Sequence, residues 1–195
     1  MQRVCVFSGS NVGARPDYEK AARVLGEELA ARGLGVVYGG AGVGLMKAVA
    51  DAALAARGEV IGVIPRHLVD KELAHTGLHD LHVVDSMHER KARMSDLADG
   101  FVALPGGYGT LEEFAEVVTW SQLGLQRKPC GLLDVAGFYQ PLMRFIDHAV
   151  DETFVVAEHR SLVLMRESAV ELVDALESWR PPAVDKWITE SPPTR

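Results

Sequence analysis

Short apolar runs alternate with longer amphipathic stretches along most of the chain. The apolar runs predict buried strands at residues 4–8, 35–38, 60–64, 81–84, 101–104, 131–133 and 162–165. Apolar residues at helical spacing predict helices over residues 17–32, 45–57, 87–98, 110–125, 139–152 and 168–179. Strands and helices in this order build a parallel sheet with helices on both faces. We therefore expect an α/β fold, a three-layer, Rossmann-like, doubly wound parallel sheet.

The length of 195 residues, 48% of them hydrophobic, suits one well-packed domain. We expect a single nucleotide-binding domain over residues 1–180. Proline pairs at Pro181-Pro182 and Pro192-Pro193 mark residues 181–195 as a C-terminal tail without chemistry of its own.

The formal net charge of −7 argues against a protein that binds nucleic acid polymers or membrane surfaces, because those partners are met by broad basic faces. The two cysteines, Cys5 and Cys130, lie inside apolar runs, which is typical of core thiols in a reduced compartment. The N-terminus enters a predicted strand directly, and no stretch resembles a signal peptide or a membrane span. We expect a cytoplasmic protein.

Three glycine-rich loops follow predicted strands, and they are the first sign of a binding site. They are Gly9-Ser10-Asn11-Val12-Gly13, Gly39-Gly40-Ala41-Gly42-Val43-Gly44 and Pro105-Gly106-Gly107-Tyr108-Gly109-Thr110. Ligands of open parallel sheets bind at the carboxyl ends of the strands, and glycines let a ligand approach the backbone closely. The start of the helix after the third loop favours an anion, most often a phosphate. One such loop can be purely structural, but three together favour a nucleotide.

The spacing of these glycines disfavours the two commonest nucleotide motifs. Gly40-x-Gly42-x-Gly44 does not match G-x-G-x-x-G, and the next strand ends in Ile64-Pro65-Arg66 instead of an acid that would hold a ribose. No Gly-Lys-Ser/Thr sequence supplies a loop for NTP hydrolysis. The pattern indicates a mononucleotide or sugar-phosphate site.

Arg90 is the first candidate for chemistry at such a site. On a helix it shares the apolar face with Met87, Met94 and Leu97, so its guanidinium should point towards the sheet. A buried guanidinium needs a carboxylate or phosphate partner. The partner can be structural, such as Glu113, or a bound phosphate, whereas the neighbouring Lys91 and Arg93 can simply be solvated.

Glu113 is the second candidate, with two interpretations. Thr110 and Glu113 match the T-x-x-E capping box, which would make the glutamate a helix cap. Alternatively, Glu113 lies about 4.5 Å along the axis from Thr110 and faces the anomeric carbon of a ribose 5-phosphate bound at the glycines. The helix dipole would keep it ionised.

His75, His79 and His82 are spaced as on a helix, but no helix is predicted over them. We therefore expect solvated side chains and no metal site. We also expect no cofactor.

The stretch 105–113, together with Met87-His88-Glu89-Arg90-Lys91, resembles the LOG family of cytokinin-activating phosphoribohydrolases, often labelled "lysine decarboxylase". The resemblance extends from residues 6–10 through 38–46 to 119–124. It implies hydrolysis of the N-glycosidic bond of a nucleoside 5′-monophosphate, AMP or N6-modified AMP, to free base and ribose 5-phosphate, by a homodimer. Arg90 and Glu113 match the catalytic pair of the family. The matching substrate contacts are Glu72, Lys91, Gly106, Gly107, Tyr108, Gly109, Thr110, Leu111, Glu112 and Thr119, to which the loop argument adds Gly9, Ser10, Gly39 and Gly40.

Ala41 and Lys47 depart from the family pattern, in which glycine is frequent at both places, and Lys47 puts a long cation beside the second loop. By analogy with glycosidases, Glu113 would stabilise the positive charge that develops on the ribose. Arg90 would hold the phosphate or ease departure of the base. The alternatives are a non-catalytic nucleotide-binding or molybdenum-cofactor carrier, and a pyridoxal-dependent decarboxylase, for which the chain shows no Schiff-base lysine constellation.

Overall fold

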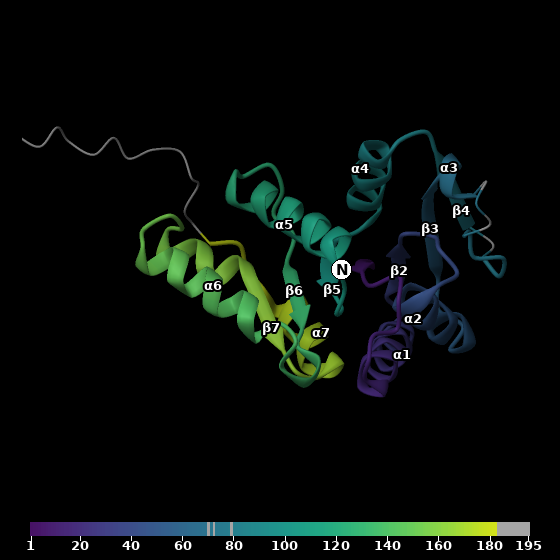
Figure 1. The fold of residues 1–195 in the computed structure, drawn as a ribbon, viewed down its shortest axis with the longest axis horizontal. Helices are drawn as coiled ribbons and strands as arrows, with labels where there is room; N and C mark the ends of the chain where they lie inside the picture. The colour runs from purple at the N-terminus through teal and green to yellow at the C-terminus, as the bar shows by residue number, and fades with distance from the viewer. Residues whose placement is uncertain (70, 72, 79, 183–195) are drawn as a thin grey trace, which may run out of the picture.

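Seven parallel strands form one sheet in the order β4-β3-β2-β1-β5-β6-β7 in the computed structural model, which describes residues 1–69, 71, 73–78 and 80–182 (Figure 1). The strands are β1 (Arg3–Phe7), β2 (Gly35–Tyr38), β3 (Val60–Pro65), β4 (Asp80–Val84), β5 (Gly100–Ala103), β6 (Cys130–Leu133) and β7 (Val163–Arg166). Each predicted strand is present within one or two residues, and every pairing is parallel. The predicted doubly wound α/β fold is confirmed. The expected tail at residues 181–195 lies almost wholly outside the described residues.

Among the described residues, six long helices cover the two faces of the sheet (Figure 1). One face carries α1 (Pro16–Ala31), α2 (Gly44–Ala55) and α7 (Ala169–Ser178), and the other carries α4 (Met87–Leu97), α5 (Tyr108–Gln122) and α6 (Gln140–Asp151). Three short segments were not predicted: α3 (Arg66–Val69), η1 (Val135–Gly137) and η2 (Ala157–Leu162). They are too short to show a helical period in the sequence.

The five inner strands are almost wholly apolar because both faces of the sheet are buried there, whereas the edge strand β4 contains the exposed Asp80 and the half-buried His82. Along β1, Val4 and Val6 pack under α1, α2 and α7, whereas Cys5 and Phe7 pack under α4, α5 and α6. Both cysteines are buried free thiols, and burial raises the pKa of Cys130 to about 12. Within the described part of the chain, no helix is both long enough and apolar enough to cross a membrane.

The connectivity places the crevice of the sheet beside β1. The chain builds β2, β3 and β4 outward on one side of β1 and then returns to place β5 on the other. The loops that leave the carboxyl ends of β1 and β5 therefore diverge to opposite faces, which is where ligands of such sheets bind. These two loops touch directly, since the amide of Gly9 donates to the carbonyl of Pro105 over 3.1 Å.

Candidate active site

A cavity of about 250 Å³ opens where the β1 loop, α2, α4 and α5 meet. We call it the Arg90–Glu113 cavity. The amide of Leu45 at the start of α2 donates to the carbonyl of Gly9, so the loops after β1, β2 and β5 are held together. The residues that line the cavity are Ser8, Gly9, Ser10, Met46, Met87, Arg90, Gly107, Tyr108, Gly109, Thr110, Glu112 and Glu113.

The start of α5 borders this cavity as an uncapped helix end. Gly107 is the N-cap residue, no side chain caps the helix, and its first turn holds no acid. A Cβ at Gly107 or Gly109 would meet nothing within 4 Å, and neither residue has a positive φ. Neither packing nor backbone conformation therefore requires glycine there. Space beside unpaired amides at the positive end of a helix dipole suits a phosphate group.

The capping box considered for Thr110 and Glu113 is wrong, because α5 begins two residues earlier than predicted. Thr110 lies inside the first turn, and its hydroxyl lies over Gly106. A Cβ added at Gly106 would come within 2.1 Å of Thr110 Oγ1. Glu113 lies in the second turn, and its carboxylate is available to the cavity rather than to the helix end.

Two side chains cap the start of α4 in a variant of the capping box, in which Glu89 accepts from the residue before the N-cap. The amide of Glu89 donates to Ser86 Oγ over 3.1 Å, and the Glu89 carboxylate accepts from the amide of Asp85 over 2.9 Å. The S-x-x-E pattern of Ser86 and Glu89 was available as a sequence signal. It fixes where α4 begins and so turns Arg90, the next residue, towards the sheet.

Arg90 is held rigidly with 8% of its surface exposed. Its Nε donates to the carbonyl of Val63 and its Nη2 to that of Gly39, each over 3.0 Å. The remaining nitrogen, Nη1, lies 3.7 Å from Glu113 Oε1 and 3.9 Å from Met87 Sδ. The guanidinium thus faces the sheet, as predicted, and Glu113, one of the two partners considered for it, lies beside it.

Glu113 is nearly as buried, with 12% of its side chain exposed. Burial raises the pKa of its carboxyl above the usual range, Arg90 opposes this rise, and Glu112 adds to it. The pKa of Glu113 is thus raised, whereas the helix dipole by itself would lower it. The dipole acts mainly on the first turn, and Glu113 lies beyond it.

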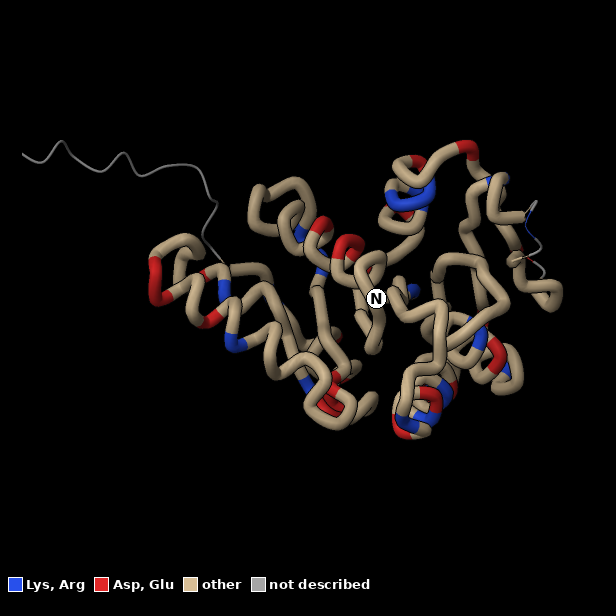
Figure 2. Tube along the Cα trace, in the orientation of Figure 1, with Lys and Arg blue, Asp and Glu red and all other residues tan. Residues whose placement is uncertain are grey.

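Lys91 is not solvated, contrary to one interpretation of the sequence. Its Nζ donates to carboxylate oxygens of Glu112 and Glu116, at 2.5 and 3.1 Å. Burial lowers the pKa of Lys91, but the two hydrogen bonds outweigh this effect and the pKa rises. The basic positions of α4 lie near the acidic positions that follow the first turn of α5 (Figure 2). Lys91 therefore joins the two helices that carry Arg90 and Glu113.

Most of the predicted site residues meet at the cavity, but several do not line it. Gly39 acts through its contact with Arg90, and Lys91 lies behind Glu112. Thr119 is exposed on α5, with Oγ1 donating to the carbonyl of Ala115. Glu72 lies outside the described residues. Gly40, Gly106 and Leu111 are also absent from the cavity lining. Ser8, Met46 and Met87 line the cavity but were not predicted as site residues. Small or apolar residues such as these carry no chemical signal in a sequence.

The loop after β2 is anchored by a buried histidine. The amide of His75 donates to the carbonyl of Gly40, and its Nε2 lies 2.9 Å from Asp51 Oδ1. Its Nδ1 accepts from the amide of Gly77, which leaves the proton on Nε2. His75 is therefore buried and bonded, although a solvated side chain was expected from the sequence. Lys47 points outward and pairs with Asp51, so its long side chain is accommodated.

The other predicted histidines do not join this group. His82 lies 2.9 Å from Asp80 Oδ1 and accepts from Arg93 Nε at its Nδ1, whereas His79 lies outside the described residues. Across the described ranges, no group of three or more His, Cys, Asp or Glu side chains is arranged to hold a metal ion.

Comparison with known proteins links this chain to one family. A family model described as "Possible lysine decarboxylase" matches residues 46–176. The chain is 48% identical to cytokinin riboside 5′-monophosphate phosphoribohydrolase LOG7 of Arabidopsis thaliana, over 92% of this chain and 83% of that protein. It is also 48% identical to cytokinin riboside 5′-monophosphate phosphoribohydrolase LOG of Oryza sativa subsp. japonica, over 92% of this chain and 74% of that protein.

Solved structures share the fold at lower identity. The molybdenum cofactor binding protein of Rippkaea orientalis superimposes with a TM-score of 0.69 at 22% identity, covering 91% of this chain and 96% of that one. The Moco carrier protein of Chlamydomonas reinhardtii gives 0.69 at 20% identity, covering 90% and 95%. These likenesses support the Rossmann-like fold alone.

Proposed function

The chain belongs to the LOG family of cytokinin riboside 5′-monophosphate phosphoribohydrolases, and we propose that it hydrolyses the N-glycosidic bond of a nucleoside 5′-monophosphate. The substrate is AMP or N6-modified AMP such as a cytokinin riboside monophosphate, and the products are the free base and ribose 5-phosphate. The observation that carries this proposal is the buried pair of Arg90 and Glu113, 3.7 Å apart, at a cavity that also holds the open start of α5.

In the proposed complex, the 5′-phosphate lies at the amides that begin α5. The open space beside Gly107 and Gly109 accommodates it, and the ribose then extends towards Glu113. Water forms a bond to C1′ while the bond from C1′ to the base nitrogen breaks, and the base leaves with a proton.

Glu113 acts on the charge that this reaction creates. Its ionised carboxylate stabilises the oxocarbenium-like transition state. Arg90 opposes the effect of burial on the pKa of Glu113 and holds the carboxylate in place. Because Nε and Nη2 of Arg90 are bound to backbone carbonyls, Nη1 is the nitrogen that faces Glu113 and the substrate.

The proposed assembly is a homodimer formed through the side of the molecule that carries α5 and α6. Large apolar side chains are exposed there, namely Leu125, Phe145, Phe154 and Val156. Large apolar side chains exposed on one side of a molecule are a feature of protein interfaces. Thr119 lies on the same helix as Glu113 and points away from the cavity of its own chain, so a partner on this side would cover it. The free, buried thiols of Cys5 and Cys130 suit the cytoplasm, where we place the protein.

The decarboxylase activity in the name of the family model has little support from these residues. No lysine lines the Arg90–Glu113 cavity among the described residues, whereas a pyridoxal enzyme would need one for its Schiff base. The carrier alternative rests on structures at 19–22% identity and needs neither Arg90 nor Glu113.

The test is release of free base from AMP and from N6-isopentenyl-AMP, followed by chromatography. Glu113→Gln should lower the rate by about 10²-fold or more, since the charge that meets the transition state is lost. Glu27→Gln, exposed on α1 and outside the cavity lining, is the matched control and should retain most of the rate. Binding of a nucleotide without cleavage by the wild type would instead favour a carrier.

A further inference from the structure

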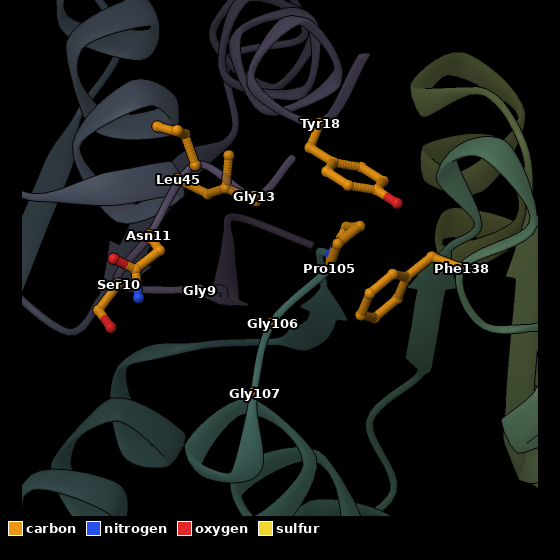
Figure 3. Close-up of a pocket in the computed structure, with 11 residues that line it drawn as sticks. Gly9, Ser10, Asn11, Gly13, Tyr18, Leu45, Pro105, Gly106, Gly107 and Phe138 are labelled. Atoms are coloured by element: carbon orange, nitrogen blue, oxygen red, sulfur yellow. The ribbon is translucent and has the colours of Figure 1, made fainter. Parts of the chain in front are cut away.

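A second cavity, of about 210 Å³, adjoins the Arg90–Glu113 cavity (Figure 3). We call it the Tyr18–Phe138 cavity. Gly9, Ser10 and Gly107 line both cavities, so the two are adjacent at the contact between the β1 and β5 loops. None of the reaction steps derived above uses the second cavity.

Two aromatic rings form one wall of this cavity. Tyr18 from α1 and Phe138 from the turn before α6 meet edge to face, with ring centroids 5.7 Å apart. Figure 3 shows both rings on one side of Pro105, with Leu45 and Asn11 on the other. Phe138 is 37% exposed, so its ring is accessible to a ligand.

Gly13 holds the Tyr18 ring in place. It has a φ of +78°, and a Cβ there would lie 2.6 Å from the ring. The loop therefore needs glycine both for its backbone conformation and for close contact with Tyr18. The Tyr18 ring of the aromatic wall therefore packs directly against the backbone of the β1 loop.

The lining of the Tyr18–Phe138 cavity contains no charged side chain. Its polar side chains are those of Ser10, Asn11 and Tyr18, and the remaining lining consists of apolar side chains and glycine backbone. A second phosphate or another charged group would find no counter-ion there. A flat, uncharged ring would find an aromatic wall to pack against.

The place of this cavity relative to the phosphate identifies how such a ring would be attached. In the proposed complex, the phosphate lies beside Gly107, which borders both cavities, and the ribose extends into the Arg90–Glu113 cavity. An oxygen of the same phosphate then faces the Tyr18–Phe138 cavity. A group esterified to that oxygen would enter it.

We propose that the Tyr18–Phe138 cavity is a subsite for an uncharged aromatic ring esterified to the 5′-phosphate, so that the protein accepts nucleoside 5′-phosphodiesters in addition to 5′-monophosphates. The inference rests on the proposed function for the position of the phosphate. Cleavage is the same hydrolysis: water adds to C1′, the bond to the base breaks, the base takes up a proton, and the phosphodiester stays intact.

The test compares the phenyl ester and the methyl ester of AMP by calorimetry and by adenine release. The wild type should bind the phenyl ester about tenfold more tightly than the methyl ester, because only the phenyl ring reaches the aromatic wall. Phe138→Leu keeps an apolar side chain but removes the flat ring, and should bring the two dissociation constants to within about twofold. AMP should bind and react as before. Phe145→Leu, on the exposed face of α6, is the control and should keep the tenfold preference.

Equal binding of the two esters by the wild type, or a preference that survives in Phe138→Leu, would overturn the inference. Tyr18→Leu serves the same purpose if Phe138→Leu does not fold. The dissociation constants decide the matter without turnover, so a protein that binds the phenyl ester selectively but leaves AMP uncleaved would refute the proposed function and not the subsite.

Discussion

The guanidinium of Arg90 occupies the space into which any side chain at position 39 would project. A Cβ on Gly39 would lie 1.8 Å from Arg90 Nη2, and that nitrogen donates to the carbonyl of the same glycine. The glycine after β2 and the arginine on α4 are therefore one structural unit. The second glycine-rich loop contributes to the site because Gly39, its first residue, leaves space for the Arg90 guanidinium.

Gly39→Ala should displace Arg90 and break its hydrogen bonds to Gly39 and Val63. We expect a loss of about 2–3 kcal/mol in the free energy of unfolding, because charge-assisted bonds are broken in a buried place. Base release should fall at least as far as in Arg90→Ala. Denaturant unfolding and the AMP assay measure the two effects.

A double mutant supplies the control for this clash. In the Arg90→Ala background the space is free, so Gly39→Ala should cost much less stability than it does in the wild type. Equal costs in the two backgrounds would show that Arg90 is not what excludes a side chain at position 39.

Gly109→Ala should separate binding from folding. A Cβ at Gly109 meets no protein atom within 4 Å, and the residue is helical, so stability should be unchanged or higher by about 0.5–1 kcal/mol. The added methyl group would fill the space that we assign to the phosphate, and the KM for AMP should rise about tenfold or more.

Gly106→Ala is the matched contrast, because its Cβ would collide with Thr110 and should destabilise the fold. Thermal unfolding and steady-state kinetics of both variants check this pair. An unchanged KM in Gly109→Ala would place the phosphate elsewhere.

The raised pKa of Glu113 predicts how activity and stability depend on pH. Since the ionised carboxylate is the active form, the acid limb of kcat/KM should lie above the usual glutamate pKa of 4.5. A carboxyl whose pKa is raised by folding contributes stability that is present below its unfolded pKa and lost as pH rises through its folded pKa.

The comparison of wild type with Glu113→Gln tests both statements. The stability of the variant relative to wild type should increase as the pH rises above 4.5, the usual pKa of a glutamate, because the buried charge is absent from the variant. A pH–rate profile and denaturant unfolding across this range provide the data. An acid limb below 4.5 would contradict the effect assigned to burial.

Phe145→Asp should weaken the proposed dimer. Phe145 is 67% exposed on α6, so an aspartate there is solvated in the monomer but would be buried without a partner in an interface. Size-exclusion chromatography with light scattering should show a shift towards monomer with unchanged monomer stability. His148 is also exposed on α6 but is not apolar. His148→Asp therefore tests whether a negative charge added to this helix is by itself enough to weaken the dimer.

The sequence by itself determined the elements and their order, because burial on one or both faces leaves a local period in the chain. Six long helices and seven strands follow from that period, and the glycine-rich loops fall at strand ends as expected. The position of Arg90 on the apolar face of its helix was also readable, since a helix of known phase fixes which side chains share a face.

Only the tertiary structure decided which residues meet. The start of α5 at Tyr108, two residues before the predicted start, made Glu113 a cavity residue rather than a cap. Two contacts join residues that are far apart in the chain. Arg90 donates a hydrogen bond to the carbonyl of Gly39, and the rings of Tyr18 and Phe138 pack against each other. A local pattern reports that a side chain is buried or exposed, but its partner depends on how the strands are ordered and how the helices pack over them.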